Sequence, residues 1–418
     1  MTGKFFSYRG GTLCCEGVAL PRVAARVSTP AYVYSRAAIE AALARFAKAF
    51  AGVPHTLCYS VKANSNLALL RLIGRHGAGF DIVSGGELFR VLRAGLRARR
   101  VVFSGVGKTM PEVDFALRSK ILFFHAESAD EVDLIAQRAR HLRQRARVAL
   151  RVNPDVDPGT LPHIATGQHD HKFGVPWGEV GGLARRVRAE PWLELVGIGS
   201  HIGSQITRLA PFQRALERLR RLAHGLRQEG LAVRYLDIGG GVGIRYQREK
   251  MFPLAKYAAL MKTTARDLNC HLILEPGRAV VASAGVLLTR VLVRKRGLRK
   301  EFLVVDAGMS DLLRPALYGA RHRILPVNGS GGAVSVVDIV GPLCETADSF
   351  AQNMRLPRLG PGALLALCDV GAYGFALASN YNSRPRPAEV LVAGERFRTI
   401  RARESWEDLV RPEARRRS

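Results

Sequence analysis

Residues 56–84 read TLCYSVKANSNLALLRLIGRHGAGFDIVS and hold two short apolar runs, TLCYSV and GFDIVS, with a Leu-rich stretch of helical period between them. A strand, a helix and a second strand in this order predict a β-α-β unit with parallel strands. Six more runs of the same kind follow up to residue 276: RVVFSG, ILFFHA, RVALRVN, LVGIGSH, YLDIGG and HLILEP. Eight strands alternating with helices predict a closed (β/α)8 barrel.

The pattern changes after Pro276. GVLLTRVLVRKR, EFLVVDAG, VSVVDIVG and EVLVAG are typical of strands separated by turns, with little helical period. The expected fold is therefore α/β: a TIM-type barrel over residues 31–280, then a mostly β domain over residues 281–418. An extended segment, residues 1–30, is expected to pack with the β domain. The chain has 418 residues, more than the roughly 250–300 at which single cores stop growing, so two domains are expected.

The chain is strongly basic, with 63 Lys and Arg against 35 Asp and Glu and a formal charge of +28. Nucleic-acid binding would be one interpretation of that charge. However, the arginines are spread along the chain with helix-like spacing and no nucleic-acid motif accompanies them, so a basic surface without a specific nucleic-acid partner is favoured. The charge would still attract small anionic molecules.

Several signals indicate a cytoplasmic protein. There is no run of ~20 apolar residues, so no membrane span is expected, and the N-terminal residues make a poor signal peptide. Six scattered cysteines without a CxxC motif suggest neither a disulfide scaffold nor a zinc ribbon. His169 and His171 have no evident third ligand nearby, so no metal site is predicted.

Polar residues gather at the predicted strand ends, where barrel enzymes carry their catalytic groups. Lys62 follows the first strand, Asp81 lies near the end of the second, His201 ends the sixth, residues 239–241 form a Gly triplet after the seventh, and Glu275 ends the eighth. Taken singly, such a lysine is usually a surface residue, such a histidine structural and such a triplet a turn. Their occurrence at matching positions of successive strands favours one shared site.

One cofactor suits these residues. A lysine at the mouth of a barrel can form a Schiff base with an aldehyde cofactor. A Gly-rich turn lets backbone N–H groups approach a phosphate closely, and Gly277 and Arg278 would add a donor and a positive charge. Glu275 could hold a pyridine nitrogen protonated, which makes the ring a strong electron sink. The predicted cofactor is pyridoxal 5'-phosphate.

Longer motifs carry a family resemblance across nearly the whole chain: YSVKAN, HIGSQ, GGG, EPGR, DAGMSDLLRPALYGA, GPLCET and GAYGFALASNYNSRPRP. With these motifs the chain resembles the fold-type III, alanine-racemase-like decarboxylases, and among them the diaminopimelate decarboxylases. The resemblance implies a pyridoxal-phosphate enzyme that converts meso-diaminopimelate to L-lysine and CO₂. In relatives the GPLCET-type loop enters the neighbouring subunit's active site, so a homodimer with shared active sites is implied.

The resemblance also implies roles for matching positions. Lys62 would carry the Schiff base, His201 would stack on the pyridoxal ring and Glu275 would face the pyridine nitrogen. Cys344 would donate the proton to the carbanion left by the lost CO₂. The implied cofactor site consists of Lys62, Asp81, His201, Ser204, Gly240, Glu275, Pro276, Gly277, Arg278 and Tyr373.

Substrate choice within this family depends on the distal end of the substrate. Diaminopimelate carries an ammonium and a carboxylate there, whereas ornithine and lysine carry only an ammonium. Arg314 and Tyr318, with Arg278, would clamp that carboxylate, because an Arg fork binds a carboxylate bidentately. Glu345 would face the distal ammonium, and Tyr373 would contact both cofactor and substrate. This set favours diaminopimelate, with an ornithine or lysine decarboxylase as the nearest alternative.

Other functions remain as alternatives. A racemase needs a weaker electron sink and an acid/base pair on opposite faces of the ring, so Glu275 and Cys344 favour decarboxylation. A pyridoxal-phosphate-binding regulatory barrel would lack both the β domain and the Cys-Glu loop. Individually, Cys344 could be a small core residue, Tyr373 a packing residue and Asp81 purely structural.

Overall fold

The computed structural model describes residues 4–160, 166–167, 172–247, 249–329 and 333–414, so His169 and His171 lie outside the described residues. The chain divides into two compact units. The barrel unit comprises Ala42–Arg245 and Glu249–Val280, and the β unit comprises Met1–Ala41, Tyr246–Arg248 and Val281–Ser418. The domain boundaries suggested at residues 30 and 280 stay a prediction.

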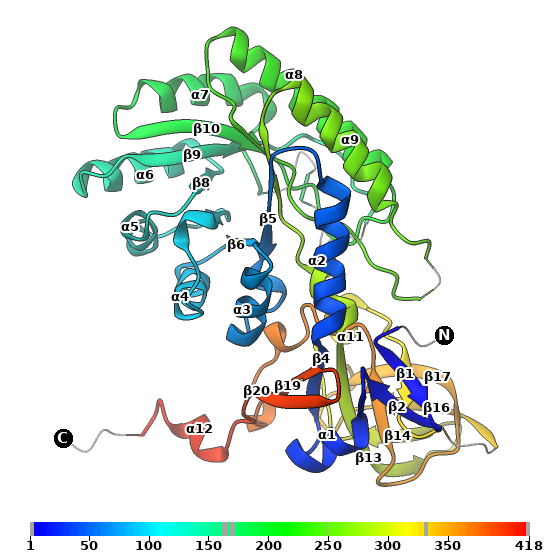
Figure 1. Ribbon diagram of the computed structural model, residues 1–418. Helices are drawn as coiled ribbons and strands as arrows, with labels where there is room; N and C mark the ends of the chain where they lie inside the picture. Colours follow the sequence, from blue (N-terminus) through cyan, green and yellow to red (C-terminus); the bar gives the residue numbers. More distant parts are fainter. Residues whose placement is uncertain (1–3, 161–165, 168–171, 248, 330–332, 415–418) are drawn as a thin grey trace. The chain divides into compact units, whose positions relative to one another are not determined.

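The barrel unit contains a closed ring of eight parallel strands, in the order β10-β11-β12-β5-β6-β7-β8-β9. β12 pairs with β5 in parallel, and β9 pairs with β10, which closes the ring. The strands are β5 (His55–Ser60), β6 (Gly79–Ile82), β7 (Val101–Phe103), β8 (Phe123–Ala126), β9 (Ala146–Arg151), β10 (Leu193–Gly199), β11 (Tyr235–Asp237) and β12 (His271–Leu274). Each strand coincides with one of the eight predicted runs and the ring is closed, so the predicted barrel is confirmed. Figure 1 labels β5, β6, β8, β9 and β10 of this ring.

Helices alternate with these strands along the chain, because their sequences carry an apolar stripe at helical spacing. α8, for example, buries Phe212, Leu216, Leu219 and Leu226, spaced three, four or seven residues apart. The helices are α2 (Arg36–Phe50), α3 (Leu67–Arg75), α4 (Gly85–Arg93), α5 (Met110–Ser119), α6 (Ala129–His141), α7 (Val180–Ala189), α8 (Ala210–Gln228) and α9 (Leu254–Asp267).

An apolar layer fills the barrel. Six buried residues from six different strands pack together: Cys58, Val102, Phe123, Ala149, Val196 and Ile273. Serine side chains cap the N-termini of helices that begin just beyond the strand ends. The Ser84 hydroxyl accepts the backbone N–H of Glu87 at the start of α4, and Ser128 accepts that of Glu131 at the start of α6. The strand ends are thereby fixed to a packed core on one side and to capped helices on the other.

The β unit is built on a nine-stranded sheet with the path β17-β16-β14-β13-β4-β19-β20. β18 pairs with β13, and β15 pairs with β18. β4 lies between β13, to which it is antiparallel, and β19, to which it is parallel. The strands are β4 (Ala31–Ser35), β13 (Gly285–Arg296), β14 (Glu301–Val305), β15 (Ile324–Pro326), β16 (Val334–Val340), β17 (Ser349–Pro357), β18 (Leu364–Leu367), β19 (Ala388–Ala393) and β20 (Arg396–Arg401).

The N-terminal residues form a small sheet, β1 (Phe6–Arg9), β2 (Thr12–Cys15) and β3 (Val18–Ala19), followed by a helix, α1 (Leu20–Val27). The sequence suggested only extended structure and turns here. α1 forms because Pro21 lies in its first turn, where no backbone donor is needed, and because Leu20, Val23 and Ala24 are buried on one face. These residues pack with Val286 and Leu288 of β13 in one apolar core.

The described residues also form three short helices: α10 (Arg278–Val281), α11 (Arg314–Tyr318) and α12 (Trp406–Val410). Among the residues that the structure describes, no helix combines the length and apolar character needed to cross a membrane. All six cysteines are free, and all except Cys344 are buried.

Candidate active site

Lys62 follows β5 in a single 3-10 turn, Val61–Ala63, and lies against the buried Asp81 of β6. The lysine Nζ lies 3.3 Å from Asp81 Oδ2, and the lysine side chain is 36% exposed while that of Asp81 is fully covered. The Ser60 hydroxyl donates to the same Asp81 oxygen over 2.8 Å. Asp81 therefore fixes an amine that is still accessible from solvent.

The Gly triplet after β11 contacts His201 through its backbone. The N–H of Gly240 donates to His201 Nδ1 over 3.0 Å, so a neutral ring carries its proton on Nε2. Burial, together with the positive charges of Lys62 and Arg151, holds the pKa of His201 well below its usual value. A Cβ on Gly240 would lie 2.2 Å from the carbonyl oxygen of Glu275, so only glycine fits this turn.

Groups suited to an anion lie beside the triplet. The buried Arg278 guanidinium donates from Nη2 to the Ser204 hydroxyl over 3.0 Å. Gly241 packs so closely that a Cβ would lie 2.3 Å from the carbonyl oxygen of Gly203. A Cβ on Gly277 would lie 2.9 Å from that of Ala63. A guanidinium, a hydroxyl and closely packed glycine backbone are the usual elements of a phosphate site.

Glu275 and Pro276 connect this edge to the lysine. The Ser60 hydroxyl donates to the Glu275 carbonyl over 2.9 Å, and the Ser60 N–H donates to the Pro276 carbonyl over 3.4 Å. Burial and the negative charges of Asp237 and Asp81 hold the pKa of the Glu275 carboxyl well above its usual value. Glu275 is thus a buried carboxyl whose surroundings favour the neutral form over the charged form.

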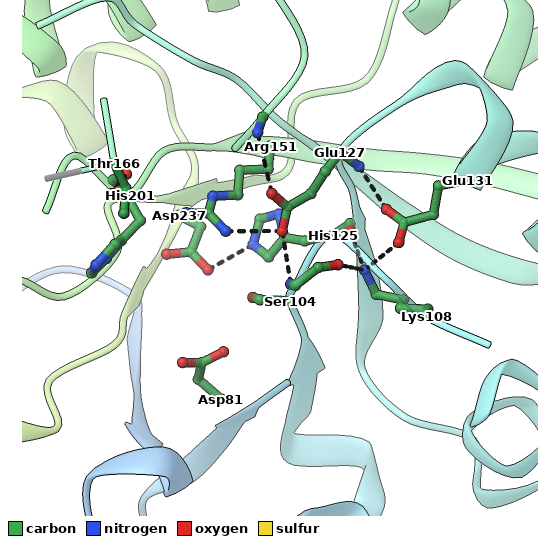
Figure 2. Close-up of polar contacts among 12 residues, drawn as sticks. Asp81, Ser104, Lys108, His125, Glu127, Glu131, Arg151, Thr166, His201 and Asp237 are labelled. Carbon is green, nitrogen blue, oxygen red and sulfur yellow. Dashed lines mark hydrogen bonds and ion pairs between the residues drawn. The ribbon is translucent and has the colours of Figure 1, made fainter. Parts of the chain in front are cut away.

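A buried ionic network borders the site and was not anticipated from the sequence (Figure 2). Lys108 Nζ lies 2.9 Å from Glu131 Oε1, and Arg151 donates to Glu127 over 2.8 Å. Glu127 also accepts the N–H of Gly105 over 2.7 Å. Burial lowers the pKa of Lys108 and raises that of Glu131. The network fixes the residues that follow β7 and β8 to Arg151 at the end of β9.

The predicted substrate residues Arg314 and Tyr318 lie at the two ends of α11 in the β unit. Arg314 is buried, donates from Nη1 to the Tyr246 hydroxyl over 2.7 Å, and has its guanidinium 4.9 Å from the centroid of that ring. Tyr318 is partly exposed. Tyr246 was missed because its surroundings, GIRYQREK, show no strand-end pattern.

Cys344 and Glu345 are exposed on the loop after β16, so Cys344 is not the core residue that its type alone would allow. Asp348 holds this loop by accepting the N–H groups of Leu343 and Met309 over 2.8 and 2.6 Å. Tyr381 hydrogen-bonds the Glu345 carboxylate, which raises the pKa of the phenol. The loop thus presents a thiol and a carboxylate on a fixed backbone.

Tyr373 adopts a left-handed backbone conformation, with φ +55°. Its neighbours leave no room for side chains: a Cβ on Gly371 would lie 1.9 Å from the Val281 carbonyl oxygen, and one on Gly374 would lie 2.4 Å from that of Val370. A bulky residue held in this conformation by closely packed glycines marks a candidate functional position.

The predicted residues therefore fall into two groups. Lys62, Asp81, His201, Ser204, Gly240, Glu275, Pro276, Gly277 and Arg278 gather at the carboxyl ends of the barrel strands, and Arg314, Tyr318, Cys344, Glu345 and Tyr373 belong to the β unit. Within the β unit, Cys344 and Glu345 share one loop.

Known proteins resemble the chain over nearly its full length. A family model described as the pyridoxal-binding domain of pyridoxal-dependent decarboxylases matches residues 36–282. Diaminopimelate decarboxylase of Pseudomonas aeruginosa is 48% identical over 405 residues, which is 97% of each chain. That of Aquifex aeolicus is 44% identical over 98% of this chain and 97% of its own.

Solved structures agree. Diaminopimelate decarboxylase from Helicobacter pylori, complexed with L-lysine, has a TM-score of 0.92 at 40% identity and covers 94% of this chain and 99% of its own. A lysine decarboxylase from Selenomonas ruminantium has a TM-score of 0.81 at 22% identity, which shows a shared fold alone.

The barrel and its strand-end residues are those of a pyridoxal-dependent decarboxylase, whose domain model covers more than half of the chain. The chain belongs to the diaminopimelate decarboxylase family. Pyridoxal phosphate, the cofactor of this class, fits the residues present: an accessible lysine amine, a guanidinium and hydroxyl for a phosphate, and a glycine turn that no side chain could enter. Asp81 Oδ1, which has no hydrogen-bond partner in the described part of the chain, provides a further buried acceptor.

Proposed function

We propose that the protein removes CO₂ from meso-2,6-diaminopimelate to give L-lysine, the last step of lysine biosynthesis. The observation that carries the proposal is an accessible Lys62 amine, held by a buried Asp81, in a barrel whose neighbouring strand ends supply an anion site. The names of relatives at 44–48% identity support diaminopimelate as the substrate.

The chemistry divides between cofactor and protein. Bound pyridoxal phosphate supplies an electron sink for the carbanion that remains when CO₂ leaves. Lys62 attaches the cofactor covalently, and Asp81 orients its amine. His201, neutral because it is buried, provides a flat face without a competing positive charge. Arg278 and Ser204 hold the phosphate, and Glu275 holds a proton toward the pyridine nitrogen.

A direct assay tests the proposal. Purified protein with pyridoxal phosphate is offered meso-diaminopimelate, lysine, ornithine and arginine separately, and the release of CO₂ is measured. We expect release from meso-diaminopimelate alone. Preferential release from lysine or ornithine would instead show a diamine-forming enzyme.

We predict that Arg314→Ala lowers kcat/KM for diaminopimelate by at least about 30-fold, which corresponds to about 2 kcal/mol, because a charged contact to the distal carboxylate is lost from a buried site. The affinity for pyridoxal phosphate should be unchanged. Steady-state kinetics and cofactor titration of the apoenzyme measure the two effects.

Tyr246→Phe is the matched control, since it removes the hydroxyl that holds Arg314 but keeps the guanidinium and the ring beneath it. It should cause a smaller loss than Arg314→Ala. A kcat/KM for Arg314→Ala within about twofold of wild type, a negligible change in transition-state binding, would contradict the role of Arg314.

We predict that Gly240→Ala weakens pyridoxal-phosphate binding by more than about tenfold, because a Cβ placed 2.2 Å from the Glu275 carbonyl must displace the backbone that contacts both the phosphate site and Glu275. Gly225→Ala in α8 is the control, since its Cβ would meet no atom within 4 Å. Cofactor affinity is measured by fluorescence titration. Equal affinity of the two variants would show that the Gly triplet is not part of the phosphate site.

The proposal includes a homodimer in which Cys344 and Glu345 of one subunit complete the site of the other. It is supported by the exposure of both residues on a loop that Asp348 holds in a fixed conformation. A cytoplasmic location is also proposed, because all six cysteines are free, as is usual in reducing compartments.

A further inference from the structure

Two buried residues close to Glu275, His125 and Asp237, have no role in the chemistry described so far. His125 belongs to β8 and Asp237 to β11, so their contact crosses the interior of the barrel (Figure 2). His125 Nε2 lies 2.9 Å from Asp237 Oδ2, and both side chains are at most 3% exposed. One ligand atom from each of His125, Asp237 and Glu275 lies within 4.8 Å of the others.

The backbone beside the His125–Asp237 pair leaves room for these two side chains and for no other. A Cβ on Gly199, at the end of β10, would lie 2.6 Å from His125 Cε1 and 2.7 Å from Asp237 Cβ. The other oxygen of Asp237, Oδ1, accepts the N–H of Gly239 over 2.8 Å. Asp237 thus connects the histidine to the first residue of the Gly triplet, and both of its oxygens accept a hydrogen bond.

The tautomer of His125 follows from its surroundings. Nδ1 is buried and has no hydrogen-bond partner among the described residues. Burial lowers the pKa of the ring, with Arg151 and Lys108 also opposing protonation while Glu275 and Glu127 favour it. A neutral ring that satisfies Asp237 must therefore carry its proton on Nε2 and donate it to the carboxylate.

We propose that Asp237 and His125 are positioning residues that keep one proton between the Glu275 carboxyl and the pyridine nitrogen of the bound cofactor. This inference rests on the proposed function, in which Glu275 faces that nitrogen. His125 and the Gly239 N–H hold Asp237 as an acceptor, and its negative charge lies close to Glu275. The proton count would stay the same, because the proton that Glu275 donates to Asp237 would be the one held toward the pyridine nitrogen once the cofactor is bound.

The charges around Glu275 favour this arrangement. Asp237 and Asp81 are negative neighbours that oppose its ionisation, whereas Lys62 and His125 oppose its protonation. The pKa of Asp237 is raised to about 7, chiefly by burial, although hydrogen bonds from Gly239 and Glu275 act in the opposite direction. Arg151 also stabilises the Asp237 carboxylate. Removing the charge of Asp237 takes a negative neighbour away from Glu275. The proton held between Glu275 and the pyridine nitrogen should therefore be released at lower pH.

The test is a spectral titration of the holoenzyme, in which the visible absorbance of the lysine-bound cofactor is followed with pH. For Asp237→Asn we expect the alkaline midpoint to fall by about one pH unit, the size typical of a lost charge neighbour in a buried site. We also expect kcat to fall more than tenfold with little change in KM, since neither Asp237 nor His125 belongs to the proposed substrate site.

Histidine variants separate positioning from packing. His125→Leu leaves Asp237 Oδ2 without a donor, so the carboxyl should take up a proton, lose its charge and shift the titration in the same direction as Asp237→Asn. His125→Gln restores an amide donor and should recover most of the wild-type midpoint. Asp114→Asn is the control, because it removes one charge from an ion pair between α5 and α6, Arg138–Asp114, and should leave the midpoint unchanged.

The outcomes are distinguishable. Wild-type midpoints and kcat in folded, cofactor-loaded Asp237→Asn and His125→Leu would overturn the inference, as would an equal shift in Asp114→Asn. The titration requires only bound cofactor. If the variants show the expected shifts but the wild-type enzyme releases no CO₂ from diaminopimelate, the proposed function is wrong. The inference that Asp237 and His125 position the Glu275 proton would still hold in that case.

Discussion

Lys62→Ala is expected to lower decarboxylation by at least about 10³-fold, since the nucleophile that holds the cofactor covalently is removed. The variant should remain folded. The Lys62 side chain is 36% exposed, and Asp81 keeps the Ser60 hydroxyl as a donor after the amine is lost. Borohydride reduction of the wild-type holoenzyme, followed by peptide mapping, should find the label on Lys62.

Lys62→Arg is the control for charge. It keeps a cation beside Asp81 but cannot form the covalent link, so it should be as inactive as alanine and equally free of label. Circular dichroism and thermal unfolding establish that both variants are folded. Label on another lysine, such as the buried Lys108, or substantial turnover by Lys62→Arg would show that the covalent site was assigned to the wrong residue.

Cys344→Ala is expected to abolish most product formation while leaving the covalent link at Lys62 intact, because the proposed proton donor acts only after CO₂ has left. The exposed position of Cys344 in the single chain leads to a second expectation. If active sites are shared, mixing inactive Lys62→Ala with inactive Cys344→Ala subunits restores one complete site in each mixed dimer. Random pairing makes about half of the dimers mixed, so activity should return to roughly a quarter of wild type.

Subunit exchange must be shown independently, for example by native mass spectrometry of differently tagged chains. Exchange without recovery would mean that each active site is formed by one chain. Cys344→Ser provides a further comparison, since a hydroxyl occupies the same place on the loop held by Asp348 but donates a proton less readily than a thiol. The activity of Cys344→Ser should lie between that of the wild type and that of Cys344→Ala.

The barrel could be predicted because each of its strands is a short apolar run bounded by a helical stretch, and both features are local. The strand-end residues followed from the same pattern, since a (β/α)8 barrel brings the carboxyl ends of its strands to one face. Lys62, Asp81, His201 and Glu275 could therefore be grouped before their distances were known.

The His125–Asp237 pair could not be identified in this way. Within ILFFHA and YLDIGG each residue is a single polar group in an apolar strand, and a contact across the barrel depends on strand register, which the local pattern does not specify. The same limit applies to β4. AYVYS was not among the predicted strands. β4 pairs with β13 and β19, which begin at Gly285 and Ala388, so the sheet that β4 joins is decided by pairing between distant segments.

The position of β4 also has a consequence for how a new chain matures. Synthesis runs from the N-terminus, and domains generally fold as units once their residues have emerged. All barrel strands have been made once Leu274 is complete. β4, whose five residues are all buried in the finished sheet, must wait for β13 and then for β19. The lysine-bearing barrel can therefore be complete on the ribosome long before the sheet of the β unit closes around β4, and a prematurely terminated chain would retain the cofactor lysine without a finished β unit.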